Sequence, residues 1–283
     1  MRGPERIQLK SPEQIAVMRE AGLVVAHALE SMREAVAPGV STGELDSLAR
    51  EILAKAGATS SFLGYDIGSG PYPGVICASV NDRVVHGIPS DAEKLREGDL
   101  ISIDFGAIVD GWHGDAAVSV PVGAVGEDVA RLNSACERSL WDGLAMAQVG
   151  RRLTDISHAV EKSVRGSGRY GIVAGYGGHG IGTEMHMAPH ILNYGRPGKG
   201  PQLRAGMTVA IEPMVTLGSR TTQERDDGWT VTTTDGSWAA HWEHTVAILD
   251  DGPWVLTALD GGRAGLAERG IELSALAAKS HIS

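Results

Sequence analysis

The 283-residue sequence has only two cysteines, Cys77 and Cys136, so it carries no framework of several disulfide bonds. It contains no apolar run long enough to cross a membrane, and its first ten residues, MRGPERIQLK, lack the apolar core of a signal peptide. Basic residues are fewer than acidic ones, 25 against 35, and the formal net charge is −10. This balance argues against a direct nucleic-acid function, because binding to phosphates needs an excess of positive charge. We therefore expect a cytoplasmic protein with no membrane partner.

The first half of the chain predicts a helical pair followed by strands. Ser11, Pro12 and Gln14 form a capping box that opens a helix over 12–36, and Ser41 with Glu44 opens a second helix that ends at about residue 57. Residues 64–74 are rich in glycine and proline and predict a loop. The segment 75–80 then predicts a strand, and 100–120 predicts two strands joined at residues 110–111.

The second half repeats this order of elements. Helices are predicted over 127–147 and 154–164, a glycine-rich loop over 175–182, and strands over 207–212 and 242–249. The letters repeat as well: REGDLISID at 96–104 resembles RAGMTVAIE at 204–212, and HGI occurs at 86–88 and at 179–181. We interpret the chain as one α+β domain with two pseudo-symmetric halves.

Acidic side chains at the ends of these strands suggest a metal site. Strand alternation places Asp104 and Asp115 on the same face of one hairpin, close enough for both carboxylates to reach the same ions. By the repeat, Glu212 and Glu243 form the equivalent pair, and His179 adds an imidazole from the glycine-rich segment. Four acids and one histidine suit two divalent ions of manganese, iron, cobalt or zinc, with a bridging water as the nucleophile.

Each of these residues also has a simpler interpretation. A single acid at a strand end, such as Asp104 or Asp115, is usually solvated or forms a turn. Glu212 and Glu243 are harder to explain in this way, because they interrupt apolar segments in which charged groups rarely lie unpaired. His113 and His241 are expected to pack in the core or to support the ligands rather than to bind metal.

A set of ordered motifs resembles a known family. The segments are SPEQIAVMREAG, VNDRVVHGIP, IDFG, DGWHGDAA, GGHGIGTEMH, AIEPM and WEHTV. Together they resemble the type I methionine aminopeptidases of the pita-bread metallopeptidase fold, in which helices flank an antiparallel sheet. The resemblance implies removal of the N-terminal methionine from nascent proteins and peptides with a small second residue, by attack of a metal-activated hydroxide. It also implies a site for two divalent metal ions (Co, Mn, Fe or Zn).

The resemblance also implies roles for individual residues of this sequence. The metal ligands it implies are the five residues selected by the repeat: Asp104, Asp115, His179, Glu212 and Glu243. The catalytic residues it implies are His86, His186 and Glu212, of which the two histidines also contact the substrate. The pocket for the methionine side chain would be lined by Phe62, Tyr65, Tyr72, Cys77, Met185 and Trp229.

Domain limits and partners complete the prediction. Residues 1–257 are expected to form a single catalytic domain, and residues 258–283 a C-terminal tail that we interpret as a frayed end. The expected partners are the N-termini of nascent polypeptides and short peptides, with transient contact to the ribosome, and the protein is expected to be a monomer. Two alternatives remain: a peptidase of the prolidase or aminopeptidase P type that cleaves X-Pro bonds, and a non-catalytic binding protein on the same scaffold.

Overall fold

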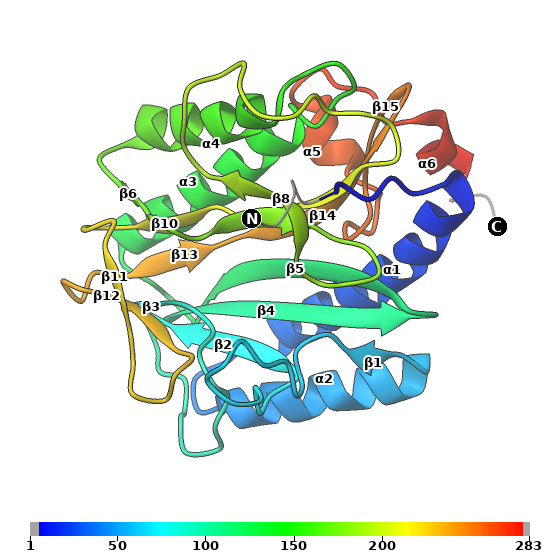
Figure 1. Ribbon diagram of the computed structural model, residues 1–283. Helices are drawn as coiled ribbons and strands as arrows, with labels where there is room; N and C mark the ends of the chain where they lie inside the picture. The colour runs from blue at the N-terminus through cyan, green and yellow to red at the C-terminus, as the bar shows by residue number, and fades with distance from the viewer. Residues whose placement is uncertain (1–5, 280–283) are drawn as a thin grey trace.

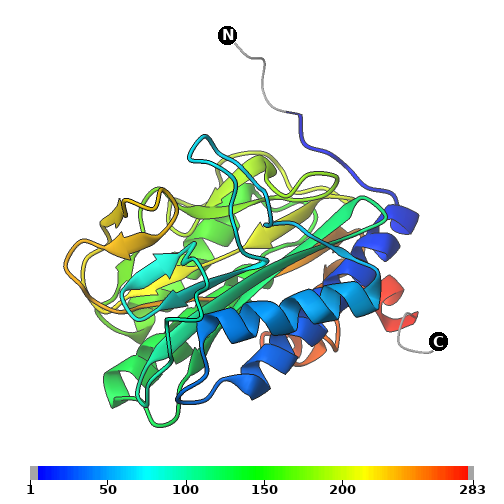
Figure 2. The same cartoon turned by 90° about the horizontal axis from the view of Figure 1, so that it is seen from below.

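The computed structural model describes residues 6–279 (Figures 1 and 2). It contains both helices and strands, as predicted. The helices are α1 (Pro12–Ala35), α2 (Thr42–Ala56), α3 (Glu127–Leu144), α4 (Leu153–Ser167), α5 (Arg263–Ala267) and α6 (Ala275–Lys279). The strands are β1 (Thr59–Ser60), β2 (Ile76–Val80), β3 (Arg83–Val85), β4 (Leu100–Val109), β5 (Trp112–Pro121), β6 (Gly171–Ile172), β7 (Gly177–Gly180), β8 (Met187–Leu192), β9 (Thr208–Ile211), β10 (Met214–Thr216), β11 (Thr222–Glu224), β12 (Val231–Thr233), β13 (Ala239–His241), β14 (Glu243–Leu249) and β15 (Gly252–Val255).

Local sequence signals fix the ends of the first two helices. The Ser11 hydroxyl accepts a hydrogen bond from the Gln14 backbone, and the Gln14 side chain accepts one from the backbone of Ser11, so the predicted capping box is formed. Ser41 and Glu44 do the same for α2. This helix ends at Gly57, whose φ of 64° is a left-handed conformation that glycine adopts without a steric penalty.

The main sheet is antiparallel and joins the two halves of the chain. Its order is β1-β4-β5-β14-β9-β7-β8, with β2 also paired to β4 and β15 to β14. The β4–β5 hairpin of the first half meets β14 of the second half, where Glu243 lies opposite Ala117. On either side of this seam the pattern repeats, because β2 pairs with β4 as β7 pairs with β9. The predicted α+β class with two pseudo-symmetric halves is confirmed.

The helices cover one face of this sheet, as Figure 2 shows for α1 and α2. Ile101, Ile103 and Phe105 of β4 are fully buried and pack in the core that α1 and α2 share with the sheet. A second core forms beneath α3 and α4, with Ile211 and Val246 among its members. Because successive side chains of a strand point to opposite faces, the residues between these core positions are presented on the other face of the sheet.

The glycine-rich segment 175–182 is not the loop that we expected, because residues 177–180 form strand β7. A Cβ atom on Gly178 would overlap the carbonyl oxygen of Ala210 on β9, and one on Gly180 would overlap the carbonyl oxygen of Ala188. The glycines therefore permit close packing of neighbouring backbones. The proposed match of HGI at 86–88 with HGI at 179–181 is also wrong, since the first-half counterpart of β7 is β2, which ends before residue 86.

The C-terminal segment is packed rather than frayed over its described residues. Leu266 of α5 belongs to the core beneath α3 and α4, and Ala277 of α6 packs with Trp254 and Leu256. Its first residues are held by Arg19 of α1, whose guanidinium donates hydrogen bonds to the carbonyl oxygens of residues 255, 256, 258 and 259. The expectation of a frayed end is therefore wrong for residues 258–277, and residues 280–283 lie outside the described part. Within residues 6–279, no helix combines the length and the apolar character needed to cross a bilayer.

Candidate metal centre and substrate pocket

Five side chains converge at the seam between the two halves. Asp104 of β4 lies opposite Ala117 of β5, and Asp115 lies opposite Gly106, so the two acids are diagonal neighbours as predicted. Glu212 follows β9, Glu243 begins β14, and His179 lies in β7. Nε2 of His179 is 3.6 Å from Oε1 of Glu212 and 4.0 Å from a carboxylate oxygen of both Asp115 and Glu243. The structure therefore brings together the acids and the histidine that the sequence selected.

The negative charges of this buried cluster repel one another unless bound protons or a cation neutralise them. Burial, reinforced by the neighbouring carboxylates, raises the pKa of Asp104, Glu212 and Glu243 well above the usual range, and burial raises that of Asp115 to about 7. Three buried carboxylate oxygens, Oδ1 of Asp104, Oδ1 of Asp115 and Oε1 of Glu243, have no hydrogen-bond partner among the described residues. Such unsatisfied oxygens are ligands for a divalent cation, so the residues present fit a metal site.

Surrounding groups orient the ligands. Nδ1 of His179 lies 3.0 Å from the carbonyl oxygen of Gly180, which fixes the proton on Nδ1 and leaves the Nε2 lone pair facing the acids. Thr245 exchanges two hydrogen bonds with the backbone of Asp115. Nε2 of His241 lies 3.7 Å from Oε2 of Glu212 and makes no hydrogen bond with the described residues, so its supporting role stays a prediction. Our sequence reasoning missed Thr245, because nothing in its local sequence signals a contact 130 residues away.

A cavity of about 90 Å³ is lined on one part by the acid cluster and on another by apolar and aromatic side chains. Its lining includes all six residues expected to form the methionine pocket: Phe62, Tyr65, Tyr72, Cys77, Met185 and Trp229. Ile67 and Val85, which the sequence did not indicate, line it too. The cavity is far smaller than the roughly 300–1,000 Å³ of typical ligand pockets, so it has room for one side chain rather than a peptide segment.

Both predicted catalytic histidines line the same cavity. Burial lowers the pKa of His86 and of His186 to about 4, so both rings are neutral near pH 7. The Tyr65 hydroxyl lies 2.7 Å from Nδ1 of His186, and the ring of His186 contacts that of His179 edge-on at 4.4 Å. His86 has a positive φ of 60°, which is uncommon for a residue with a side chain and is often found at functional sites.

A second, open cavity of about 590 Å³ adjoins this one. It shares His86, His179, His186 and Glu212 with the smaller cavity, and Tyr176, Glu184 and His190 also line it. Glu212 and the three shared histidines therefore line both the small cavity and the wide groove.

Comparisons with known proteins agree with this geometry. Residues 16–250 match the model of metallopeptidase family M24. The chain is 55% identical to methionine aminopeptidase 1 of Mycobacterium tuberculosis over 91% of this chain and 97% of that protein. The crystal structure of a methionine aminopeptidase from Thermotoga maritima superposes with a TM-score of 0.86 at 41% identity, covering 89% of this chain and all of that chain.

A more distant likeness concerns the fold alone. Prolidase from Pyrococcus furiosus superposes with a TM-score of 0.70 at 21% identity, over 88% of this chain and 65% of that one. The much higher identities to the methionine aminopeptidases favour them over the prolidase alternative. The chain belongs to metallopeptidase family M24 and, within it, to the methionine aminopeptidases.

Proposed function

We propose that this protein removes the N-terminal methionine from polypeptides and peptides whose second residue is small. The observation that carries the proposal is the cavity of about 90 Å³, in which Phe62, Tyr72 and Trp229 form an apolar wall next to the acid cluster. A methionine side chain is unbranched, apolar and polarizable, and it packs well against aromatic rings. The adjoining open groove gives the rest of the peptide a path away from the site.

The five residues Asp104, Asp115, His179, Glu212 and Glu243 would hold two divalent metal ions, for which cobalt, manganese, iron and zinc are the candidates. When bound, such ions polarise a carbonyl group and lower the pKa of water, so that hydrolysis proceeds near neutral pH. Three of the carboxylates have the unsatisfied oxygens that this role requires. His179 offers Nε2, since its Nδ1 is engaged by a backbone carbonyl.

The remaining chemistry belongs to groups of the chain. Glu212 would accept the proton of the attacking water and return it to the leaving amine, a role that suits a carboxyl whose pKa burial has raised. His186, neutral and bonded to Tyr65, would donate a hydrogen bond to the oxygen of the scissile carbonyl. His86, whose ring lies edge-on to that of Trp229, would contact the peptide around the same bond.

The proposed specificity for the N-terminus of a peptide follows from the negative charge of the cavity. The cavity carries four acids and no lysine or arginine among its lining residues. A free α-ammonium group would be attracted to this cluster, whereas an acetylated or internal amide nitrogen would bring no charge. We accordingly propose an exopeptidase that acts on the N-termini of nascent chains and short peptides. Residues 1–257 would be its catalytic domain, and the cytoplasmic location, monomeric state and ribosome contact expected from the sequence remain predictions.

The test is release of methionine from Met-Ala-Ser by protein stripped of metal with a chelator, before and after adding manganese, cobalt, iron(II) or zinc. We expect metal-dependent release that falls at least about a hundredfold in Glu212→Gln, because that variant loses both a ligand charge and the proton acceptor. Glu51→Gln, which changes an acid exposed on α2, is the matched control and should retain full activity. N-acetylated Met-Ala-Ser should not be cleaved, and Met-Leu-Ser should be cleaved poorly.

The two alternatives give different results. A prolidase-like enzyme would cleave an X-Pro peptide in preference to Met-Ala-Ser. A non-catalytic binding protein would release no methionine with any metal, even when the sample is shown to be folded. Either result would overturn the proposal.

A further inference from the structure

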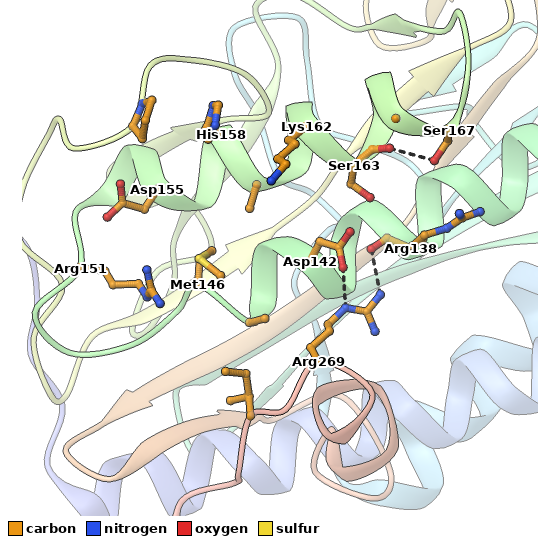
Figure 3. Close-up of a pocket in the computed structure, with 15 residues that line it drawn as sticks. Arg138, Asp142, Met146, Arg151, Asp155, His158, Lys162, Ser163, Ser167 and Arg269 are labelled. Carbon is orange, nitrogen blue, oxygen red and sulfur yellow. Dashed lines mark hydrogen bonds and ion pairs between the residues drawn. The ribbon is translucent and has the colours of Figure 1, made fainter.

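The outer surface of α3 and α4 carries a groove of about 640 Å³, away from the acid cluster (Figure 3). We call it the α3–α4 groove and define it by Arg138, Asp142, Met146, Arg151, Asp155 and Lys162. Its volume lies within the roughly 300–1,000 Å³ of sites for small molecules. None of the residues that line it takes part in the function proposed above.

Both acids of the groove, Asp142 and Asp155, accept hydrogen bonds from the protein. Asp142 accepts a hydrogen bond from Nε of Arg269 at 2.6 Å, and this arginine also donates to the carbonyl oxygens of Gly265 and Arg138. Asp155 accepts hydrogen bonds from the backbone amides of Arg152 and Gly198, each at 2.8 Å. Both carboxylates of the groove are therefore already engaged by donors of the protein.

The remaining charged groups of the groove are cations. The side chains of Arg138, Arg151 and Lys162 are exposed and make no ion pair or hydrogen bond within residues 6–279, although Arg151 exerts a longer-range attraction on Asp155. Lys162 extends from α4 toward Met146, with Arg151 at one end of the groove and Arg138 at the other (Figure 3). These three cationic side chains, whose donors have no partner in the described part of the protein, fit a ligand with several anionic oxygens.

Two further features narrow the chemistry of the ligand. Half-buried Met146 and Ile271 give the groove an apolar surface, against which an uncharged organic group would pack. The chain as a whole has a net charge of −10, which would repel a long polyanion that extended beyond the groove. A compact ligand with a phosphate at one end and an apolar or aromatic group at the other meets both conditions.

We propose that the α3–α4 groove binds a nucleoside phosphate, with the phosphates at Lys162 and Arg151 and the base against Met146. The contacts are exposed to water, so the binding is expected to weaken as salt is added. The site is independent of the peptidase reaction and of the metals that support it. Its test therefore measures binding rather than hydrolysis.

The experiment is calorimetric titration of the full-length, metal-loaded protein with magnesium ATP, and in parallel with inorganic phosphate, at about 0.15 M salt. We expect one saturable ATP site per chain. Arg151→Glu/Lys162→Glu should weaken ATP binding about tenfold or more, since it replaces two attractions by two repulsions. Met146→Gln should weaken the binding of ATP but not that of phosphate.

Two controls locate the site. Lys55→Glu/Arg96→Glu makes the same change of net charge at exposed positions of the first half, and its ATP affinity should remain within about twofold of the unaltered protein. Glu212→Gln tests whether phosphates bind instead at the metal centre, and it too should retain ATP binding. Unchanged cleavage of Met-Ala-Ser by the groove variants would show that they are folded.

Four results would overturn the proposal. They are the absence of saturable binding, equal losses in the groove and control variants, loss of binding in Glu212→Gln alone, and equal affinity for phosphate and ATP. Tighter binding of a short RNA than of ATP, through the same residues, would also overturn it in favour of a polymer ligand.

Discussion

The hydroxyl of Tyr65 lies 2.7 Å from Nδ1 of His186. Burial, together with the nearby charge of Glu184, raises the pKa of Tyr65, so its hydroxyl keeps its proton at neutral pH. Burial lowers the pKa of His186 to about 4, so its ring is uncharged there. A hydroxyl that donates to Nδ1 leaves the proton of the ring on Nε2, where it is available to a substrate oxygen.

We therefore predict that Tyr65→Phe lowers kcat for Met-Ala-Ser about tenfold with a smaller change in KM, because the imidazole loses the partner that fixes its tautomer. Steady-state kinetics with saturating metal would measure this. Tyr170→Phe is the matched control, since it removes a hydroxyl from a tyrosine that lines neither cavity of the site. Equal losses in the two variants would contradict an orienting role for Tyr65.

A second prediction concerns the close approach of β7 and β9. Gly178→Ala would place a methyl group against the carbonyl of Ala210, the residue directly opposite His179. We expect β7 to be displaced, with a loss of about 1–3 kcal/mol in the free energy of unfolding and a weaker affinity for metal. Denaturant unfolding and metal titration would measure the two effects.

The control for this substitution is Gly166→Ala in α4, where an added Cβ meets nothing within 4 Å. This change should leave metal affinity unaltered and should stabilise the protein by up to about 1 kcal/mol. If Gly178→Ala bound metal as tightly as Gly166→Ala did, the glycine would not be needed for the position of His179.

The parts of the site that the sequence predicted are those that follow from local periodicity. The diagonal relation of Asp104 and Asp115 follows from strand alternation and a two-residue turn, at which Asp110 has a φ of 48° and Gly111 a φ of 79°. The sequence also predicted the helix caps, because the two residues of each capping box lie three positions apart. The internal repeat then extended the reasoning from one pair of acids to the other.

What the sequence did not predict depends on contacts between distant segments. The strand character of β7 arises from glycines that allow backbones to approach, yet glycine is also the commonest sign of a loop. The support that Thr245 gives to Asp115, and the hydrogen bonds from Arg19 to residues 258 and 259, involve partners more than 100 residues away. Regular spacing of residues in the sequence does not indicate contacts between such distant positions.

A third prediction tests the attachment of the C-terminal segment. The buried guanidinium of Arg19 donates to the carbonyl oxygens of Leu256 and Ala258, each at 2.6 Å. Arg19→Met should lower the free energy of unfolding by about 2–4 kcal/mol, because several buried carbonyl groups lose their partner. It should also expose residues 259–279 to limited proteolysis. Arg33 is exposed on the same helix, so Arg33→Met should change the free energy of unfolding by no more than about 0.5 kcal/mol. A similar effect of both substitutions would show that the hydrogen bonds of Arg19 do not hold the C-terminal segment.

The last prediction concerns Lys10, which is buried and has no carboxylate within ion-pair distance among the described residues. Burial lowers the pKa of its ammonium group from 10.5 to about 8. Between these two values the unfolded chain binds more protons than the folded chain, so this group makes the protein more stable as the pH rises from about 8 to 10.5. Below pH 8 the full cost of burying the charge is present.

Lys10→Met should therefore raise the free energy of unfolding at pH 7. The lowering of the pKa from 10.5 to about 8 corresponds to a gain of up to about 3 kcal/mol, and this gain should shrink toward zero by about pH 10.5. Denaturant unfolding of both proteins at pH 7 and pH 10.5 measures the difference. Lys55→Met, which changes an exposed lysine, should show no such dependence on pH. A gain that is the same at both pH values would mean that the methionine stabilises through packing alone, and that the charge of Lys10 carries no cost in the folded protein.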